Sequence, residues 1–99
     1  MAPIYKLWMM KKFTGAWWQL SEQERHALRA QVRDALKQVG GKQVLECSSA
    51  WCTEEWPHFG VEEFPDIEAV QKHTHLLHEL NWPCYVESVS MLGTKPPTS

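Results

Sequence analysis

The sequence predicts an α+β fold, in which a four-stranded antiparallel sheet carries two helices on one of its faces. Three observations lead to this prediction. The chain has 99 residues, which suits one small domain. Hydrophobic residues make up 43% and charged residues 22%, a composition typical of globular chains and not of disordered ones. Strand-like and helix-like segments then follow one another in the order β-α-β-β-α-β.

The first strand and the first helix are predicted over residues 3–13 and 21–39. Residues 3–13 are rich in large apolar side chains and no helix cap precedes them, which indicates a strand. Ser21 and Glu24 have the spacing of a capping box, in which each side chain accepts a hydrogen bond from the other residue's amide. Apolar residues then recur at helical spacing until Gly40, where the helix is expected to end.

The second half of the chain predicts two strands, a helix and a final strand. The strands are expected over residues 42–52 and 57–64, the helix over 66–81 and the last strand over 84–92. Pro83 cannot continue the helix. Two right-handed βαβ units in this order form the ferredoxin-like split sandwich.

The domain is expected to comprise residues 1–93, followed by a flexible tail over residues 94–99 that is rich in Pro and Thr. The first strand has large apolar side chains on both of its faces, which indicates that both faces are covered. The helices cover one face, so we expect a second copy of the chain to cover the other, as a homodimer through the sheet faces. The two apolar sets are Tyr5, Leu7 and Met9 on one side and Ile4, Trp8 and Met10 on the other.

Charge and composition exclude several partners and compartments. The net charge is −2, which argues against binding to nucleic acid or to an anionic membrane surface. No apolar run approaches the ~20 residues of a membrane span. The three cysteines do not suggest a disulfide framework, and the N-terminal residues lack the pattern of a secretory signal. A cytoplasmic protein is therefore expected.

Three stretches resemble the dimeric α/β-barrel superfamily. Residues 16–25, which read AWWQLSEQER, are similar to the entry to the first helix in darcynin-like members. Residues 61–70 resemble the junction of the third strand with the second helix, and Trp82 followed by residues 85–89 resembles the final strand. The resemblance implies a ferredoxin-like fold and dimers. It does not imply one activity, because members include cofactor-independent monooxygenases, polyketide cyclases, lactone isomerases, haem-handling proteins and proteins with no known reaction.

The second predicted helix carries the candidate acid–base histidines. His73 falls inside its apolar stripe and His78 lies at the edge, whereas His75 and His26 are expected on the surface. An imidazole below an apolar layer is a suitable general acid or base, because its usual pKa of about 6.5 is close to physiological pH. The alternative is a packed histidine that is hydrogen-bonded to a backbone carbonyl.

A weaker resemblance to polyketide cyclases of the olivetolic acid type concerns His58. Those enzymes have a histidine at the same offset before the third-strand phenylalanine, which is Phe64 here, and another near the position of His78, displaced by one residue. Their histidine in the first strand has no counterpart in this chain. Gly60, two positions after His58, lacks a side chain and is expected to open room beside the sheet.

Carboxylates within the predicted strands are a further candidate feature. A carboxylate on a covered sheet face needs a partner or a polar pocket, and Lys6 is one available partner. A paired carboxylate and a catalytic one therefore both remain possible. The residues concerned are Glu46, Glu62, Glu63 and Glu87.

No metal site or cofactor is expected. Cys47 and Cys52 are five positions apart, so on one strand their side chains point to opposite faces. His75 and His78 lack a fixed third ligand. Neither a haem-attachment motif nor a glycine-rich phosphate loop is present.

The aromatic residues suggest a flat, apolar ligand. Trp17 and Trp18 lie between the first strand and the first helix, where they are expected at the entrance of a pocket. Filling of the dimer core is the alternative role for the aromatic residues. Further lining residues are expected to be Trp51, Phe59, Gly60, Glu62, Trp82 and Tyr85.

These observations favour a small cofactor-independent enzyme that acts on a hydrophobic or aromatic, polyketide-like molecule by cyclisation, isomerisation or oxygenation. His58, His73 or His78 is expected to move a proton, and Tyr85 is the candidate to polarise an oxygen. The alternative is a non-catalytic module of the same fold that binds a small molecule or supports assembly.

Overall fold

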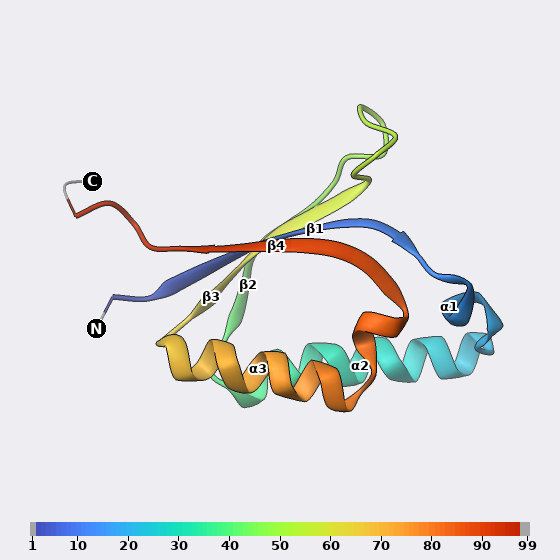
Figure 1. Cartoon of the computed structure of the whole chain (residues 1–99), viewed down its shortest axis with the longest axis horizontal. Helices are drawn as coiled ribbons and strands as arrows, with labels where there is room; N and C mark the ends of the chain where they lie inside the picture. Colours follow the sequence, from blue (N-terminus) through green and yellow to red (C-terminus); the bar gives the residue numbers. More distant parts are fainter. Residues whose placement is uncertain (1, 98–99) are drawn as a thin grey trace.

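The computed structural model describes residues 2–97 and has the predicted ferredoxin-like architecture (Figure 1). Its four strands form one antiparallel sheet in the order β2-β3-β1-β4, and the two long helices lie side by side on one face of the sheet. The elements are β1 (Ile4–Phe13), α1 (Gly15–Gln19), α2 (Glu22–Gln38), β2 (Lys42–Ser48), β3 (His58–Phe64), α3 (Ile67–Glu79), η1 (Trp82–Cys84) and β4 (Val86–Gly93).

The predicted capping box is present at the start of α2. The Ser21 hydroxyl accepts from the Glu24 amide at 3.1 Å, and the Ser21 amide donates to the Glu24 carboxylate at 2.9 Å. The capping hydrogen bonds to Ser21 hold the pKa of Glu24 below its usual value. Asp66 caps α3 in a similar way, because its carboxylate accepts from the Ala69 amide at 2.8 Å.

Two segments differ from the predictions. The short helix α1 occupies the break that was expected between the first strand and α2. The second strand ends at Ser48, so Trp51 and Cys52 lie in a loop and not in the strand expected over residues 42–52. Ser49 closes this loop, because its amide donates to the Pro57 carbonyl at 2.8 Å and its hydroxyl donates to the Trp56 carbonyl.

The hydrophobic core lies between the sheet and the helices, near the C-terminal end of β3. Phe64 is completely buried there, and Ile4 packs against the same cluster from β1. Ile4 and Phe64 are directly opposite each other in the β1–β3 pairing, so their side chains share the face that the helices cover. The cluster is completed by Leu36, Val39, Ala69 and Val70.

Because side chains alternate along a strand, this position assigns the two faces of the sheet. On β1, Lys6, Trp8 and Met10 share the helix-covered face with Ile4. The other face, here called the open face, is largely apolar, and Met91 is 66% exposed on it. Its apolar residues, from four strands, are Tyr5, Leu7, Met9, Leu45, Cys47, Phe59, Val61, Val89 and Met91, and it also carries the ion pair of Lys42 with Glu63.

The C-terminal residues and the lengths of the helices complete the description of the fold. Residues 94–97 follow β4 without forming a helix or strand, and residues 98 and 99 of the predicted tail lie outside the described residues. Among the residues described, no helix combines the length and the apolar character needed to cross a bilayer.

Candidate functional site

His58 and Glu46 form an imidazole–carboxylate pair on the helix-covered face. His58 is the first residue of β3, and Glu46 lies on the neighbouring strand β2, opposite Gly60. The distance from His58 Nε2 to the Glu46 carboxylate is 3.0 Å, and both side chains are accessible to solvent in part. A carboxylate in this position accepts a hydrogen bond from one ring N–H and leaves the other nitrogen, Nδ1, free to accept a proton from a substrate.

Trp8 and Gln43 fill the space above Gly60. A Cβ atom at Gly60 would lie 2.6 Å from the Trp8 ring, 2.5 Å from the Gln43 amide nitrogen and 2.7 Å from the Leu45 carbonyl oxygen. Gly60 was predicted to open room beside the sheet. The structure shows that the side chains of Trp8 and Gln43 fill this room. The Trp8 ring also stacks on His58, with 5.9 Å between ring centroids.

A bulge in β2 explains the position of Gln43. The β2–β3 register shifts between Gln43 and Leu45, which leaves Val44 as the extra residue. The Gln43 side-chain amide donates to the Leu45 carbonyl at 2.6 Å and to the Val61 carbonyl at 3.3 Å. These two hydrogen bonds fix Gln43 against the backbone at the edge of the site.

Glu62 and Lys6 face each other across β3 and β1, on the same covered face. Burial raises the pKa of Glu62; the charge of Lys6 opposes this change and the charge of Glu46 adds to it. Burial also lowers the pKa of Lys6, and the Glu62 carboxylate opposes that change. Electrostatic interactions therefore join Glu46, Glu62 and Lys6 in one network.

His73 completes this network from the helix layer. It lies on α3, is 2% exposed, and its ring is tilted against Phe64 with 5.2 Å between centroids. Burial, with a smaller contribution from the charge of Lys6, lowers its pKa from 6.5 to about 4, so His73 is neutral at physiological pH.

Two buried polar atoms in this region have no hydrogen-bond partner within residues 2–97: His73 Nδ1 and the Trp8 indole nitrogen. An unsatisfied buried polar atom costs roughly 1–3 kcal/mol, so native proteins usually satisfy such atoms with water or a ligand. These atoms, together with His58, Glu46, Glu62 and Lys6, define what we call the covered-face network.

Several predicted site residues lie elsewhere. His78 is exposed on α3, and Trp51 is 86% exposed in the loop after β2. Phe59 is on the open face, opposite Met9. His58, Gly60, Glu62 and His73 are the predicted site residues that the structure places on or against the covered face.

The remaining predicted aromatics form a second cluster, at the end of β1. Trp17 is 1% exposed and stacks on Phe13 with 4.4 Å between centroids. Trp82 and Tyr85 meet the Trp17 ring edge-on, at 5.9 and 6.4 Å. Trp18 is exposed beside this cluster, whereas Trp17 forms part of the interior and is not at a pocket entrance.

Trp8, a member of the covered-face network, and Gln43 at its edge were not predicted as site residues. Trp8 was expected only as a core or dimer residue, and Gln43 was not considered. The sequence held a signal for Trp8: it lies two residues after Lys6 on one strand, so both side chains point to the same face of the sheet. No sequence signal identifies Gln43, because its position depends on the bulge.

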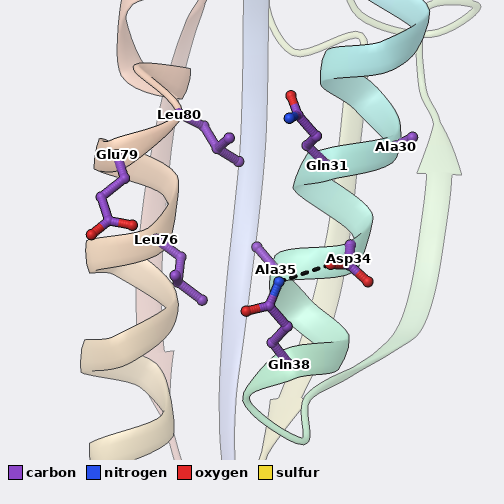
Figure 2. A pocket seen from close by; sticks show the side chains of 8 residues that line it. All are labelled: Ala30, Gln31, Asp34, Ala35, Gln38, Leu76, Glu79 and Leu80. Carbon is purple, nitrogen blue, oxygen red and sulfur yellow. Dashed lines mark hydrogen bonds between the residues drawn. The ribbon is translucent and has the colours of Figure 1, made fainter.

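Two surface hollows lie away from the network. The first, of about 550 Å³, runs between α2 and α3, and Figure 2 shows Leu76 and Leu80 facing α2 across it. The second, of about 640 Å³, lies at the loop after β2 and includes Trp51. The first is lined by Ala30, Gln31, Asp34, Ala35, Gln38, Leu76, Glu79 and Leu80. Neither hollow is lined by a histidine.

Metal binding receives no support from the side chains of residues 2–97. No group of three or more His, Cys, Asp or Glu residues within that range is arranged to hold a metal ion. Cys47 is partly buried on β2, whereas Cys52 and Cys84 are exposed, and all three are free thiols.

Comparisons with known proteins show the fold. No protein-family model and no curated protein sequence matches this chain. Among solved structures, the methylated RPA0582 protein of unknown function from Rhodopseudomonas palustris is 18% identical, with a TM-score of 0.69 over 99% of this chain and 84% of that one.

Two further solved structures show the range of proteins that share this fold. Chlorite dismutase from Candidatus Nitrospira defluvii is 13% identical, with a TM-score of 0.68 over 95% of this chain but only 41% of the enzyme. A dimeric protein of unknown function and ferredoxin-like fold from Bacteroides fragilis is 8% identical, with a TM-score of 0.51 over 96% and 98%. The structural neighbours thus include an enzyme, a dimer and proteins of unknown function.

Proposed function

We propose that the covered face of the sheet binds a small hydrophobic or aromatic carbonyl compound and moves a proton on it. The observation that carries this proposal is the His58–Glu46 pair, with 3.0 Å between Nε2 and the carboxylate, on the same face of the sheet as Glu62 and Lys6. Proton removal beside a carbonyl is the step that cyclisation, isomerisation and cofactor-independent oxygenation of polyketide-like molecules share. Such an enzyme is the function that the geometry supports best.

In this proposal His58 is the general base. The Glu46 carboxylate accepts a hydrogen bond from Nε2–H of His58, which leaves Nδ1 unprotonated and able to take a proton from a carbon beside the substrate carbonyl. The resulting imidazolium is stabilised by the Glu46 carboxylate, and it returns the proton to a carbon or oxygen of the enolate. The Trp8 ring, stacked on His58, supplies a flat apolar surface for the body of the substrate.

Glu62 and Lys6 are proposed to bind a second polar group of the same molecule. Glu62 lies four positions after His58 on β3, which corresponds to about 13 Å on a strand, and Lys6 is opposite Glu62 on β1. Polyketide-like molecules carry oxygen on alternate carbons along the chain, so one molecule can offer one polar group to His58 and another to Glu62 and Lys6. The raised pKa of Glu62 makes it a proton donor as well as a ligand for a hydroxyl or carbonyl group.

We also propose that the protein is a homodimer joined through the open faces of two sheets. Leu45, Val89 and Met91 are roughly half exposed or more on this face, and an apolar surface of this kind marks an interface. The dimeric neighbour of the same fold supports this assembly. Helices would then lie on the outside, with one covered-face network in each copy.

The proposal is tested by hydrogen exchange on benzoylacetone, an aromatic 1,3-diketone. Loss of its C2 proton signal in D2O is followed by NMR for the wild type and for His58→Gln, Glu46→Gln and His26→Gln. Because a general base typically contributes 10²–10⁴-fold, we expect the protein-catalysed exchange rate to fall at least about 100-fold in His58→Gln and by less in Glu46→Gln. His26 is exposed on α2, so His26→Gln should retain the wild-type rate.

An equal exchange rate in the wild type and His58→Gln would contradict the assignment of the base. Binding of benzoylacetone by calorimetry without any acceleration of exchange would contradict catalysis. That result would favour the second candidate function, a non-catalytic small-molecule binder, which the closed packing around Trp17 and Phe64 also suits.

A further inference from the structure

Two arginines of α2 lie on aromatic rings at the far end of β1. The Arg29 guanidinium is 5.1 Å from the centroid of Trp17 and 5.5 Å from that of Phe13. The Arg25 guanidinium is 5.4 Å from the ring centroid of Trp18. The two arginines are one helical turn apart, about 6 Å along the axis.

Most of the donors of these two guanidinium groups are free. Arg25 Nε donates to the Leu20 carbonyl at 3.2 Å, and within residues 2–97 no hydrogen bond or ion pair involves the side chain of Arg29. A guanidinium that stacks on a ring uses its face, so its in-plane N–H groups remain available. The nearest capping carboxylate, Glu24, is held by the Ser21 amide.

The rings hold the guanidinium groups in fixed positions. Phe13 stacks on Trp17, and Trp82 meets Trp17 edge-on, so Arg29 lies on a packed aromatic surface. The hydrogen bond to Leu20 fixes Arg25 from its other end. Among the described residues neither guanidinium has an ion-pair partner, and a planar guanidinium fork suits bidentate binding of a carboxylate.

We propose that Arg25, Arg29 and Trp18 form a binding site for a small aromatic carboxylic acid. The carboxylate would bind the free N–H groups of the two arginines. The aromatic ring of the ligand would lie against Trp18, which is 61% exposed. This site is separate from the covered-face network, because Phe13 lies three positions, or about 10 Å, beyond Met10, the residue of β1 that pairs with His58.

The experiment is calorimetric titration with 2-naphthoate and with the neutral analogue 2-naphthalenemethanol. We expect 2-naphthoate to bind, and Arg29→Gln and Arg25→Gln each to weaken its binding by about 10-fold or more, as expected for a charge-assisted hydrogen bond. Arg33 is the matched control, since it lies one turn further along α2, is exposed and has no such ring contact within residues 2–97. Arg33→Gln should retain the wild-type affinity.

Three results would overturn the proposal: equal affinity for the neutral analogue, equal affinity for inorganic phosphate, or unchanged 2-naphthoate binding in Arg29→Gln. Arg29→Lys keeps the charge but loses the planar fork, so we expect it to bind 2-naphthoate more weakly than the wild type. If Arg29→Gln does not fold, Arg29→Lys and Arg25→Gln give the answer. His58→Gln should leave 2-naphthoate binding intact, which separates this site from the proposed catalytic one.

Discussion

The two faces of the sheet reverse the usual distribution of polar and apolar residues. The face below the helices, which would normally be a simple apolar core, carries Lys6, Glu46, His58 and Glu62. The open face, which would normally be polar toward solvent, has apolar residues from all four strands, with the Lys42–Glu63 ion pair at one end. The ionisable residues thus gather on the face that the helices cover, and exposed apolar residues gather on the face that they leave open.

This difference has a thermodynamic meaning. Burial of the ionisable groups of Lys6, Glu62 and His73 costs free energy of folding, and perturbed ionisable groups of this kind cluster at functional sites. An exposed apolar face costs solubility unless another surface covers it. We interpret the covered face as a site of chemistry and the open face as the dimer interface.

The largest expected effect concerns the open face. Leu7 lies near its centre, opposite Val61 and Met91. A buried unpaired charge costs about 3–5 kcal/mol, so Leu7→Lys should weaken dimerisation at least about 100-fold. Light scattering at micromolar concentration should show a wild-type dimer and a monomeric variant. The control Gln71→Lys places the same charge on the exposed side of α3, so this variant should remain a dimer. A monomeric wild type would contradict the proposed dimer interface.

On the covered face, His73 should make stability depend on pH. Its pKa is lowered from 6.5 to about 4, so the unfolded chain binds a proton more readily than the folded one between these values. Stability is therefore fully present above about pH 6.5 and is lost as the pH falls toward 4, by about 3 kcal/mol in total. In urea unfolding at pH 7 and pH 4.5, His73→Leu should lose less stability than the wild type.

His75→Leu is the control for that experiment, because His75 lies on the exposed side of the same helix and pairs with Glu79. It should keep the pH dependence of the wild type. An identical loss of stability in the wild type and His73→Leu would show that His73 is not the residue responsible.

Gly60→Ala should disturb the covered face through packing. Its new Cβ would meet Trp8, Gln43 and the Leu45 carbonyl, all closer than 3 Å, and the carbonyl belongs to a paired strand. Overpacking of this kind costs about 1–3 kcal/mol, which thermal unfolding measures directly. Gly15→Ala is the control, since a Cβ at Gly15 meets nothing within 4 Å, and its stability should equal or exceed that of the wild type.

The smallest expected effect is a change in the pKa of Glu62 when the charge of Lys6 is removed. The charge of Lys6 opposes the burial that raises the pKa of Glu62, so Lys6→Met should raise that pKa further. An NMR titration of the Glu62 side-chain carboxyl carbon measures this change. Lys11→Met removes an exposed charge from the same strand and should leave the titration of Glu62 unchanged; a lower pKa in Lys6→Met would contradict the coupling.

The fold was predictable because its local signals agree with its global arrangement. The capping box at Ser21, the apolar periodicity of the helices and the order of the elements all indicate the same sandwich. The apolar residues on both sides of the first strand predicted two covered faces; the helices cover one, and cover of the other by a second copy stays a prediction. The loop after Ser48 was missed because its strand-like residues are closed into a turn by Ser49, whose partners lie seven and eight positions later.

The site was predictable only in part. Strand parity placed His58, Gly60 and Glu62 on one face, and helical periodicity buried His73. The pairing of His58 with Glu46 depends on the register of β2 against β3, which a bulge at Val44 shifts. Tertiary arrangement also separated one aromatic cluster from the histidines, because its members pack around Phe13, beyond the part of β1 that pairs with β3. These members are Trp17, Trp18, Trp82 and Tyr85.

One measurement tests the assignment of the two faces directly, because a methionine marks each of them. Met10 lies on the covered face, opposite His58, whereas Met9 and Met91 lie on the open face. Protein labelled with ¹³C in its methionine methyl groups is titrated with benzoylacetone and followed by NMR. We predict that the Met10 methyl signal shifts while those of Met9 and Met91 do not. Shifts confined to Met9 and Met91 would place the ligand on the open face and contradict the account.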